Sequence, residues 1–108
     1  QINFKSTLEN YQLDDNYTIS EVKAKEEFYG KTLSVLDTID KYRLTLITII
    51  RKREKKNLIG KKSIVKETIG RLSPNTIVLK DDILVVYGYN KDIETYCLGQ
   101  EEYQKRKA

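Results

Sequence analysis

The chain has 108 residues, a net charge of +4 and no histidine. With Cys97 as its one cysteine, it cannot form Ser-His or Cys-His nucleophile pairs, or zinc sites built from His and Cys. No apolar run approaches the roughly 20 residues that a membrane-spanning helix needs. A chain of this length supports one domain with one modest core. Its Ile, Val and Leu content and its eight tyrosines favour a small α+β domain over a helical bundle.

In chain order, residues 1–13 predict a linker or short helix left from a preceding domain, because their apolar side chains fall at loose helical intervals. Residues 17–24 are rich in β-branched and aromatic side chains and predict a first strand. A glycine at position 30 breaks the chain, and residues 32–37 then predict a short helix. Residues 44–50 have apolar side chains on both faces, which predicts a central strand covered on each side by a helix or by another subunit.

The positive charge is concentrated in residues 51–71, where nine Lys or Arg side chains face only Glu54 and Glu67. Charge patterning favours a solvated loop here. Contact with a membrane surface or a partner subunit stays open as an alternative. Nucleic-acid binding is disfavoured, because no aromatic residue for base stacking lies between Tyr42 and Tyr87.

The second half of the chain predicts further strands. Residues 64–68 alternate weakly and predict either an additional strand or the return arm of a basic hairpin. Two strands are then expected at 77–79 and 83–87. Between them, the pair Asp81-Asp82 favours a turn in which a carboxylate accepts backbone N–H bonds, as does the earlier pair Asp14-Asp15. A metal site is disfavoured, since no third acidic ligand is near in sequence.

A final helix is expected from Asn90, a favourable N-cap, to a stop near Gly99. Ile93, Tyr96 and Cys97 share the stripe that would face the core. The charged residues 100–108 predict a frayed tail. None of these features assembles into a catalytic constellation, so no enzyme activity is predicted.

Two blocks of the chain resemble the C-terminal domain of RCK (regulator of potassium conductance) proteins, the cytosolic subunits of Ktr/Trk-type potassium uptake systems. The first block starts with Gly-Lys-Thr-Leu, ends in Leu-Asp over residues 30–37, and is followed by Tyr42. The second is the proline-led run over residues 73–88, which contains Asp82 and ends in glycine. Both blocks occur in the family's order, and together they cover roughly residues 14–99.

The resemblance implies a small mixed sheet with two or three short helices in βαβ-β-β-α order, and a homodimer. It implies that residues 14–99 are a regulatory domain with no catalytic site, metal or cofactor of its own. Through the full-length protein, the domain would act in the cytoplasm, against the inner face of the membrane, on a membrane-embedded potassium channel or transporter. Alternative functions are a basic nucleic-acid-binding module and a ligand-free dimerisation domain of another cation transporter.

The dimer cleft of Ktr-type members binds cyclic di-AMP, and the resemblance places that cleft between the first helix and the central strand, near the loop before the proline. Tyr42 matches the family pattern, whereas Ile39 and Thr45 stand where an arginine and an asparagine are usual. Lys41 or Arg43 could supply the missing cation. The resulting candidate ligand residues are Ile39, Lys41, Tyr42, Arg43, Thr45, Leu72 and Pro74.

Overall fold

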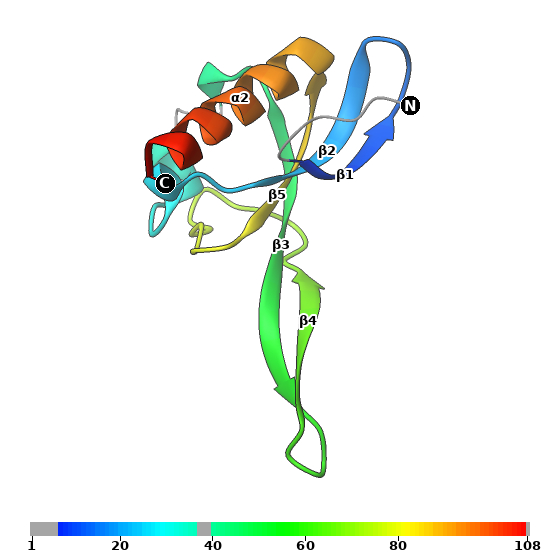
Figure 1. Cartoon of the computed structure of the whole chain (residues 1–108), viewed down its shortest axis with the longest axis vertical. Helices are drawn as coiled ribbons and strands as arrows, with labels where there is room; N and C mark the ends of the chain where they lie inside the picture. Colours follow the sequence, from blue (N-terminus) through cyan, green and yellow to red (C-terminus); the bar gives the residue numbers. More distant parts are fainter. Residues whose placement is uncertain (1–6, 37–39, 108) are drawn as a thin grey trace.

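The computed structural model describes residues 7–36 and 40–107 of the chain. Five strands form one sheet in the order β1-β2-β5-β3-β4, and helix α2 packs against β2 and β5 (Figure 1). The elements are β1 (Thr7–Gln12), β2 (Tyr17–Lys23), the 3-10 turns η1 (Glu26–Phe28) and η2 (Leu33–Val35), β3 (Thr45–Lys56), β4 (Lys62–Thr68), β5 (Ile83–Tyr89) and α2 (Asn90–Lys107). The α+β class is confirmed. The sheet is antiparallel at every described pairing, however, and not mixed.

The core lies between α2 and the sheet. The predicted helix stripe of Ile93, Tyr96 and Cys97 is buried there, as expected. The facing sheet side chains include Val22, Leu84, Val86 and Ile49, all of them buried. Phe28, from η1, closes one side of this core with its ring centroid 6.4 Å from that of Tyr96.

The alternation predicted for residues 44–50 is wrong beyond Leu46, because β3 contains a bulge. Leu46 lies opposite Val86 and Ile49 lies opposite Leu84, with a register shift between Leu46 and Thr48. A bulge inserts one extra residue into one strand of an antiparallel pair. Leu46 and Ile49 therefore share the helix-covered face although they are three residues apart. The most central strand is β5, not β3.

The helix or linker predicted over residues 1–13 is also wrong for its described part, because Thr7–Gln12 pairs with β2 as an edge strand. The turn between the two strands explains this. Asp14 Oδ1 accepts the N–H groups of Asn16 at 2.8 Å and Tyr17 at 2.9 Å, which confirms the turn role predicted for this carboxylate. Such an Asx-type turn reverses the chain and brings the preceding residues alongside β2.

Three further boundaries differ from the prediction. The helix expected at 32–37 is only the 3-10 turn η2 within its described part. Residues 77–79 form one isolated bridge, between Thr32 and Ile77, and no strand. Helix α2 begins at Asn90 as predicted but continues past Gly99 to Lys107, so the tail predicted to fray from residue 100 is helical. The Glu, Gln, Lys and Arg that follow the glycine are good helix formers, and one interior glycine costs only about 1 kcal/mol.

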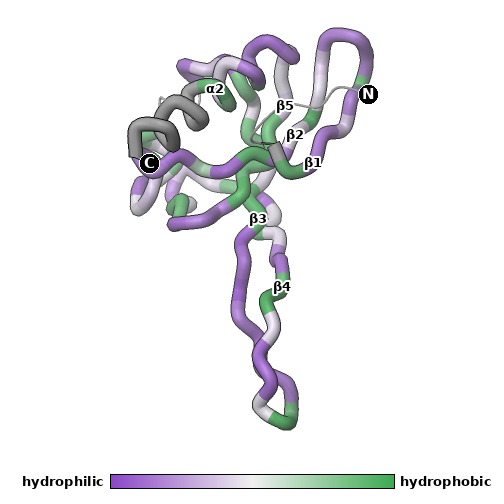
Figure 2. The backbone as a smooth tube through the Cα atoms, viewed as in Figure 1, coloured by the Kyte–Doolittle hydropathy of each residue, from purple (hydrophilic) through white to green (hydrophobic). Residues whose placement is uncertain are grey.

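The basic segment is exposed to solvent, as predicted, but it is not a loop, and the alternative of a basic hairpin is confirmed. β3 runs on to Lys56, and β4 returns beside it in register from Lys62. We call residues 51–68 of this hairpin the arm. It projects away from the helix-covered body, as Figure 1 shows. In Figure 2 the β3 side of the arm is hydrophilic, the β4 side also carries an apolar stretch, and the tip is apolar.

Candidate functional site

The two sequence blocks that carry the family resemblance lie side by side in space. Residues 30–36 and 72–78, which we call the paired loops, are joined by backbone hydrogen bonds. Gly30 N–H donates to the Val78 carbonyl at 2.7 Å, and Ser34 N–H donates to the Pro74 carbonyl at 3.0 Å. Gly30 has φ +77°, a left-handed conformation that favours glycine. The first block therefore turns at its glycine and runs along the second.

The glycine that ends the second block is required by close packing. A Cβ on Gly88 would lie 2.5 Å from Cδ2 of Leu44. Leu44 is itself buried and leads into β3. The absence of a side chain at Gly88 thus lets the start of β3 approach the end of β5.

Asp82 anchors the turn before β5, as predicted, and it has a partner that the sequence did not reveal. Its Oδ2 accepts the Leu79 N–H at 2.8 Å, which confirms the turn role. Arg51 binds the same carboxylate with Nε at 2.9 Å and Nη2 at 2.8 Å, and Nη2 also donates to the Ile77 carbonyl at 2.9 Å. The hydrogen bond to Asp82 raises the pKa of Arg51 above its ordinary value.

Arg51 belongs to the segment predicted to be solvated, but the strand boundaries could have identified its role. The predicted strand 44–50 ends just before Arg51, and the predicted strand 83–87 begins just after Asp82. If the two strands pair antiparallel with Ile50 opposite Ile83, as they do, the two charges meet. Because the Asp82 side chain is fully buried, this pair fixes the root of the arm to the body.

Tyr42 is partly buried and packs against the core. Its ring makes an edge contact with Tyr96, with centroids 5.2 Å apart. The Lys25 ammonium donates to the Tyr42 hydroxyl at 2.7 Å and lies 4.6 Å from the centroid of the Tyr96 ring. Burial raises the pKa of Tyr96, whose hydroxyl donates to the Lys23 carbonyl at 2.7 Å. Lys25 is a member of this cluster that the sequence pattern did not indicate.

The remaining candidate ligand residues fall into two groups. Lys41 and Arg43 are exposed beside the start of β3, and Thr45 lies opposite Tyr87 near the end of β5. Leu72 packs half-buried against the core, and Pro74 is exposed in the paired loops. The Ile77 carbonyl of these loops accepts a hydrogen bond from Arg51, a residue of β3 that lies beside the start of β5. Ile39 lies outside the described residues. Thr45 thus lies near the end of β5, whereas the paired loops are attached beside its start.

The sheet face opposite α2 carries aromatic side chains and a buried carboxylate oxygen. Tyr17 stacks on Tyr87 with centroids 5.7 Å apart and meets Tyr89 edge-on at the same distance. Tyr17 and Tyr89 are partly exposed. On the same face, Glu21 lies opposite Val85, and its Oε1 is buried without a hydrogen-bond partner among the described residues. We call this surface the open face.

Comparison with known proteins identifies no relative: no protein-family model matches the chain, and no curated protein matches it. In residues 7–36 and 40–107, no helix has the length and apolar character needed to cross a membrane. The same residues contain no cluster of three or more His, Cys, Asp or Glu side chains that could hold a metal ion.

Proposed function

We propose that the chain is a regulatory, dimerising ligand-binding domain of a Ktr/Trk-type potassium transport system. In this proposal it acts in the cytoplasm, at the inner face of the membrane, through a membrane-embedded channel or transporter subunit. The observation that carries the proposal is the pairing of residues 30–36 with residues 72–78. Two sequence blocks that each resemble the same domain family are thus joined into one structural unit, with the Asp82 turn and Gly88 in packed positions.

The open face supports the dimer. A sheet with aromatic side chains on the face that its own helix does not cover has an apolar surface for a second copy. In a two-fold dimer each copy presents the same surface, so Tyr17 and Tyr87 of one chain would meet their equivalents or near neighbours. Buried polar atoms are almost always satisfied, and a donor from the second copy would satisfy Glu21.

The proposed ligand is cyclic di-AMP, bound across the two-fold. Its phosphates need cationic donors, and Lys41 and Arg43 are exposed for that role. Since Thr45 lies near the end of β5 and the paired loops are attached beside its start, a cleft that uses both Thr45 and Pro74 would be completed by contributions from two copies. A two-fold symmetric dinucleotide suits such a site, because each half meets the same residues.

Calorimetry with cyclic di-AMP, combined with light scattering, tests this proposal. We expect a dimer at micromolar concentration that binds one dinucleotide. Arg43 has φ +61°, so Arg43→Asn removes the cation while keeping a residue that tolerates this conformation. It should weaken binding about tenfold. Lys91→Asn, an exposed cation at the start of α2, is the matched control and should leave binding unchanged.

The outcomes separate the parts of the proposal. A dimer that gives no heat would retire the dinucleotide and favour a ligand-free dimerisation domain. A strict monomer would contradict the whole proposal. The transport role is tested in the gene that encodes the chain: replacing Asp82 with alanine there should alter rubidium uptake under potassium limitation, whereas Lys91→Asn should not.

A further inference from the structure

The arm is a two-stranded ribbon beyond the edge of the packed sheet. β5 pairs with β3 only as far as Ile50, so residues 51–56 pair with β4 alone among the described strands. An isolated two-stranded ribbon is marginally stable in water. Nearly all side chains of the arm are exposed, so burial of apolar surface does not explain why the ribbon is this long. Its surface therefore needs an explanation other than packing within the chain.

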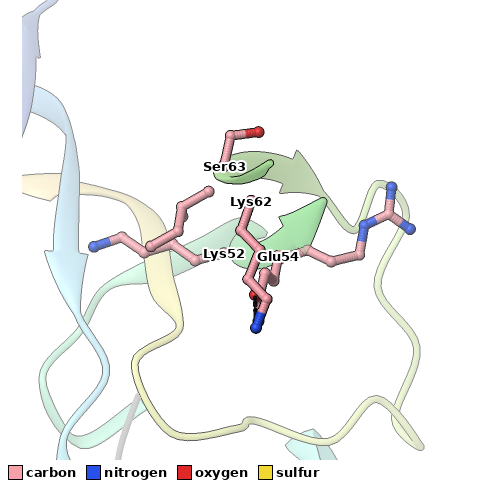
Figure 3. A pocket seen from close by; sticks show the side chains of 6 residues that line it. Lys52, Glu54, Lys62 and Ser63 are labelled. Carbon is pink, nitrogen blue, oxygen red and sulfur yellow. Dashed lines mark ion pairs between the residues drawn. The ribbon is translucent and has the colours of Figure 1, made fainter. Parts of the chain in front are cut away.

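The charges of the arm oppose one another across the ribbon. Lys52 lies directly opposite Lys66, and Lys56 lies directly opposite Lys62. Directly opposed residues share a face of the ribbon, and like charges there are destabilising. Among the described residues, two ion pairs lie within the arm: Lys62 with Glu54, at 3.3 Å and drawn in Figure 3, and Arg53 with Glu67, at 2.9 Å.

Five lysines of the arm have no acidic partner among the described residues. They line both faces and the tip: Lys52, Lys55, Lys56, Lys61 and Lys66. An anionic surface would relieve the repulsion that these side chains create. Charge complementarity thus points to a polyanionic partner.

The tip of the arm is an ordered turn that holds two apolar side chains outward. Asn57 N–H donates to the Lys61 carbonyl at 3.0 Å, and Asn57 Oδ1 accepts the Ile59 and Lys61 N–H groups at 3.0 and 2.9 Å. Leu58 is fully exposed, and Ile59 is 85% exposed. Scattered apolar side chains on a surface are ordinary. Two adjacent ones at the extremity of a lysine-rich arm form an amphipathic tip.

From these contacts we propose that the arm docks on an anionic lipid bilayer, with Leu58 and Ile59 in the interface and the lysines at the phosphate headgroups. The distance from the tip to the nearest lysines agrees with the depth to which apolar groups enter a bilayer interface. Lys56 and Lys62, at the strand ends, lie about two residues or ~7 Å behind the tip. Interfacial apolar groups enter a bilayer by about 5–10 Å. The lysines would then lie at the depth of the headgroups, which attract cationic side chains near the membrane surface.

A nucleic acid is the less favoured polyanion. Base recognition uses aromatic stacking or bidentate side-chain contacts, which the planar guanidinium fork of Arg makes with a more fixed geometry than the ammonium of Lys. The arm has no aromatic residue, Arg51 is bound to Asp82, and Arg53 is paired with Glu67. The arm's cations without a carboxylate partner among the described residues are all lysines, which act as point charges. This inference does not depend on the potassium proposal, since it uses only residues of the arm.

Vesicle sedimentation of the whole chain tests the inference. The chain should bind vesicles of phosphatidylcholine with phosphatidylglycerol and not vesicles of phosphatidylcholine alone. The tip variant Leu58→Ser/Ile59→Ser and the charge variant Lys55→Gln/Lys56→Gln/Lys61→Gln should each weaken binding at least about tenfold. The control Lys31→Gln/Lys80→Gln/Lys91→Gln removes the same charge from exposed positions on the body and should change binding less than about twofold.

A fluorescent probe tests insertion directly. The chain contains no tryptophan, so Leu58→Trp introduces a single reporter at the tip. Its emission should shift to the blue on anionic vesicles and be quenched by brominated lipids, whereas the reporter in Lys91→Trp should not respond. Absence of vesicle binding, or binding that the tip variant leaves unchanged, would overturn the inference. So would tighter binding to duplex DNA than to anionic vesicles, lost in the same variants. Dinucleotide calorimetry is a separate readout, so either proposal can fail alone.

Discussion

The body of the domain and the arm share one continuous strand, β3, and yet they are stabilised by different interactions. In its first half β3 pairs with β5, and Ile49 is buried on the face of the sheet that helix α2 covers. In its second half it pairs with β4 alone and buries almost nothing. Arg51 lies at the change between the two environments. One strand thus belongs to the hydrophobic core at one end and to an exposed two-stranded ribbon at the other.

The largest difference in the free energy of unfolding is expected between truncation of a buried core side chain and truncation of an exposed apolar side chain of the arm. Phe28→Ala should lower the free energy of unfolding by about 3–5 kcal/mol, because the ring is fully buried against Tyr96. Ile64→Ala, on the exposed arm, should change it by no more than about 0.5 kcal/mol. Urea denaturation of both variants measures this. Equal losses would mean that the arm folds as part of the core.

The next effect concerns the ion pair at the root of the arm. Asp82→Ala leaves Arg51 without its carboxylate and the Leu79 N–H without its acceptor, so we expect a loss of about 3 kcal/mol. A double-mutant cycle over Asp82 and Arg51 should give a coupling energy of about 1–3 kcal/mol.

The pair Arg53 and Glu67 provides the matched cycle on the arm. Its two side chains are 64% and 49% exposed, against full burial for Asp82. Exposed pairs are worth about 0–1 kcal/mol. A larger coupling in this cycle than at Asp82 would reverse the distinction drawn between body and arm.

Tyr96 makes the stability of the body depend on pH in the alkaline range. Burial raises its pKa in the folded state above the ordinary value of about 10. The contribution of this hydroxyl is fully present below the unfolded pKa and is lost as pH rises above it. Tyr96→Phe should cost about 1 kcal/mol at neutral pH, through the lost bond to the Lys23 carbonyl.

Stability measured from about pH 9 to 11 should then fall less steeply for Tyr96→Phe than for the unsubstituted chain. Tyr11, which is largely exposed on β1, supplies the control. Tyr11→Phe should keep the full slope. If both variants flatten the curve alike, the alkaline loss does not come from burial of Tyr96.

The smallest effect is expected from the arm charges. Replacing Lys55, Lys56, Lys61 and Lys62 with glutamine should shift the melting temperature little, since surface changes stay within about 0.5 kcal/mol each. Removing the opposed charges of Lys56 and Lys62 relieves a repulsion, but it also removes the exposed ion pair of Lys62 with Glu54, so the two effects offset one another. Thermal unfolding followed by circular dichroism would detect a collapse, which would show that these lysines support the fold.

Features set by local sequence could be predicted. The strands at 17–24 and 83–87, the start of α2 and its buried stripe follow from periodicity and composition. The turns at Asp14 and Asp82 follow from carboxylates that accept nearby backbone N–H groups. Periodicity does not indicate that the two loops pair, although the family resemblance identifies both blocks.

Features set by distant partners could not be predicted. The extra residue of the bulge at Ile47 moves Ile49 to the helix-covered face, and only the register with β5 reveals it. Lysine-rich residues 52–56 have low strand propensity. They become a strand because β3 enters from the core already extended and the Asn57 turn returns β4 beside it. In the candidate site, the Lys25 contact with Tyr42 likewise depends on packing between elements.

The attachment of Arg51 has a mechanical consequence. Leu58, at the tip of the arm, lies about seven residues, or ~23 Å, beyond this side chain. A force applied sideways at Leu58 therefore has a moment about Arg51. Its guanidinium is bonded to Asp82 and to the Ile77 carbonyl, so the load passes into residues 77–82. Residues 77 and 78 belong to the paired loops, so part of the load on the arm reaches those loops in addition to β5, with which β3 is paired.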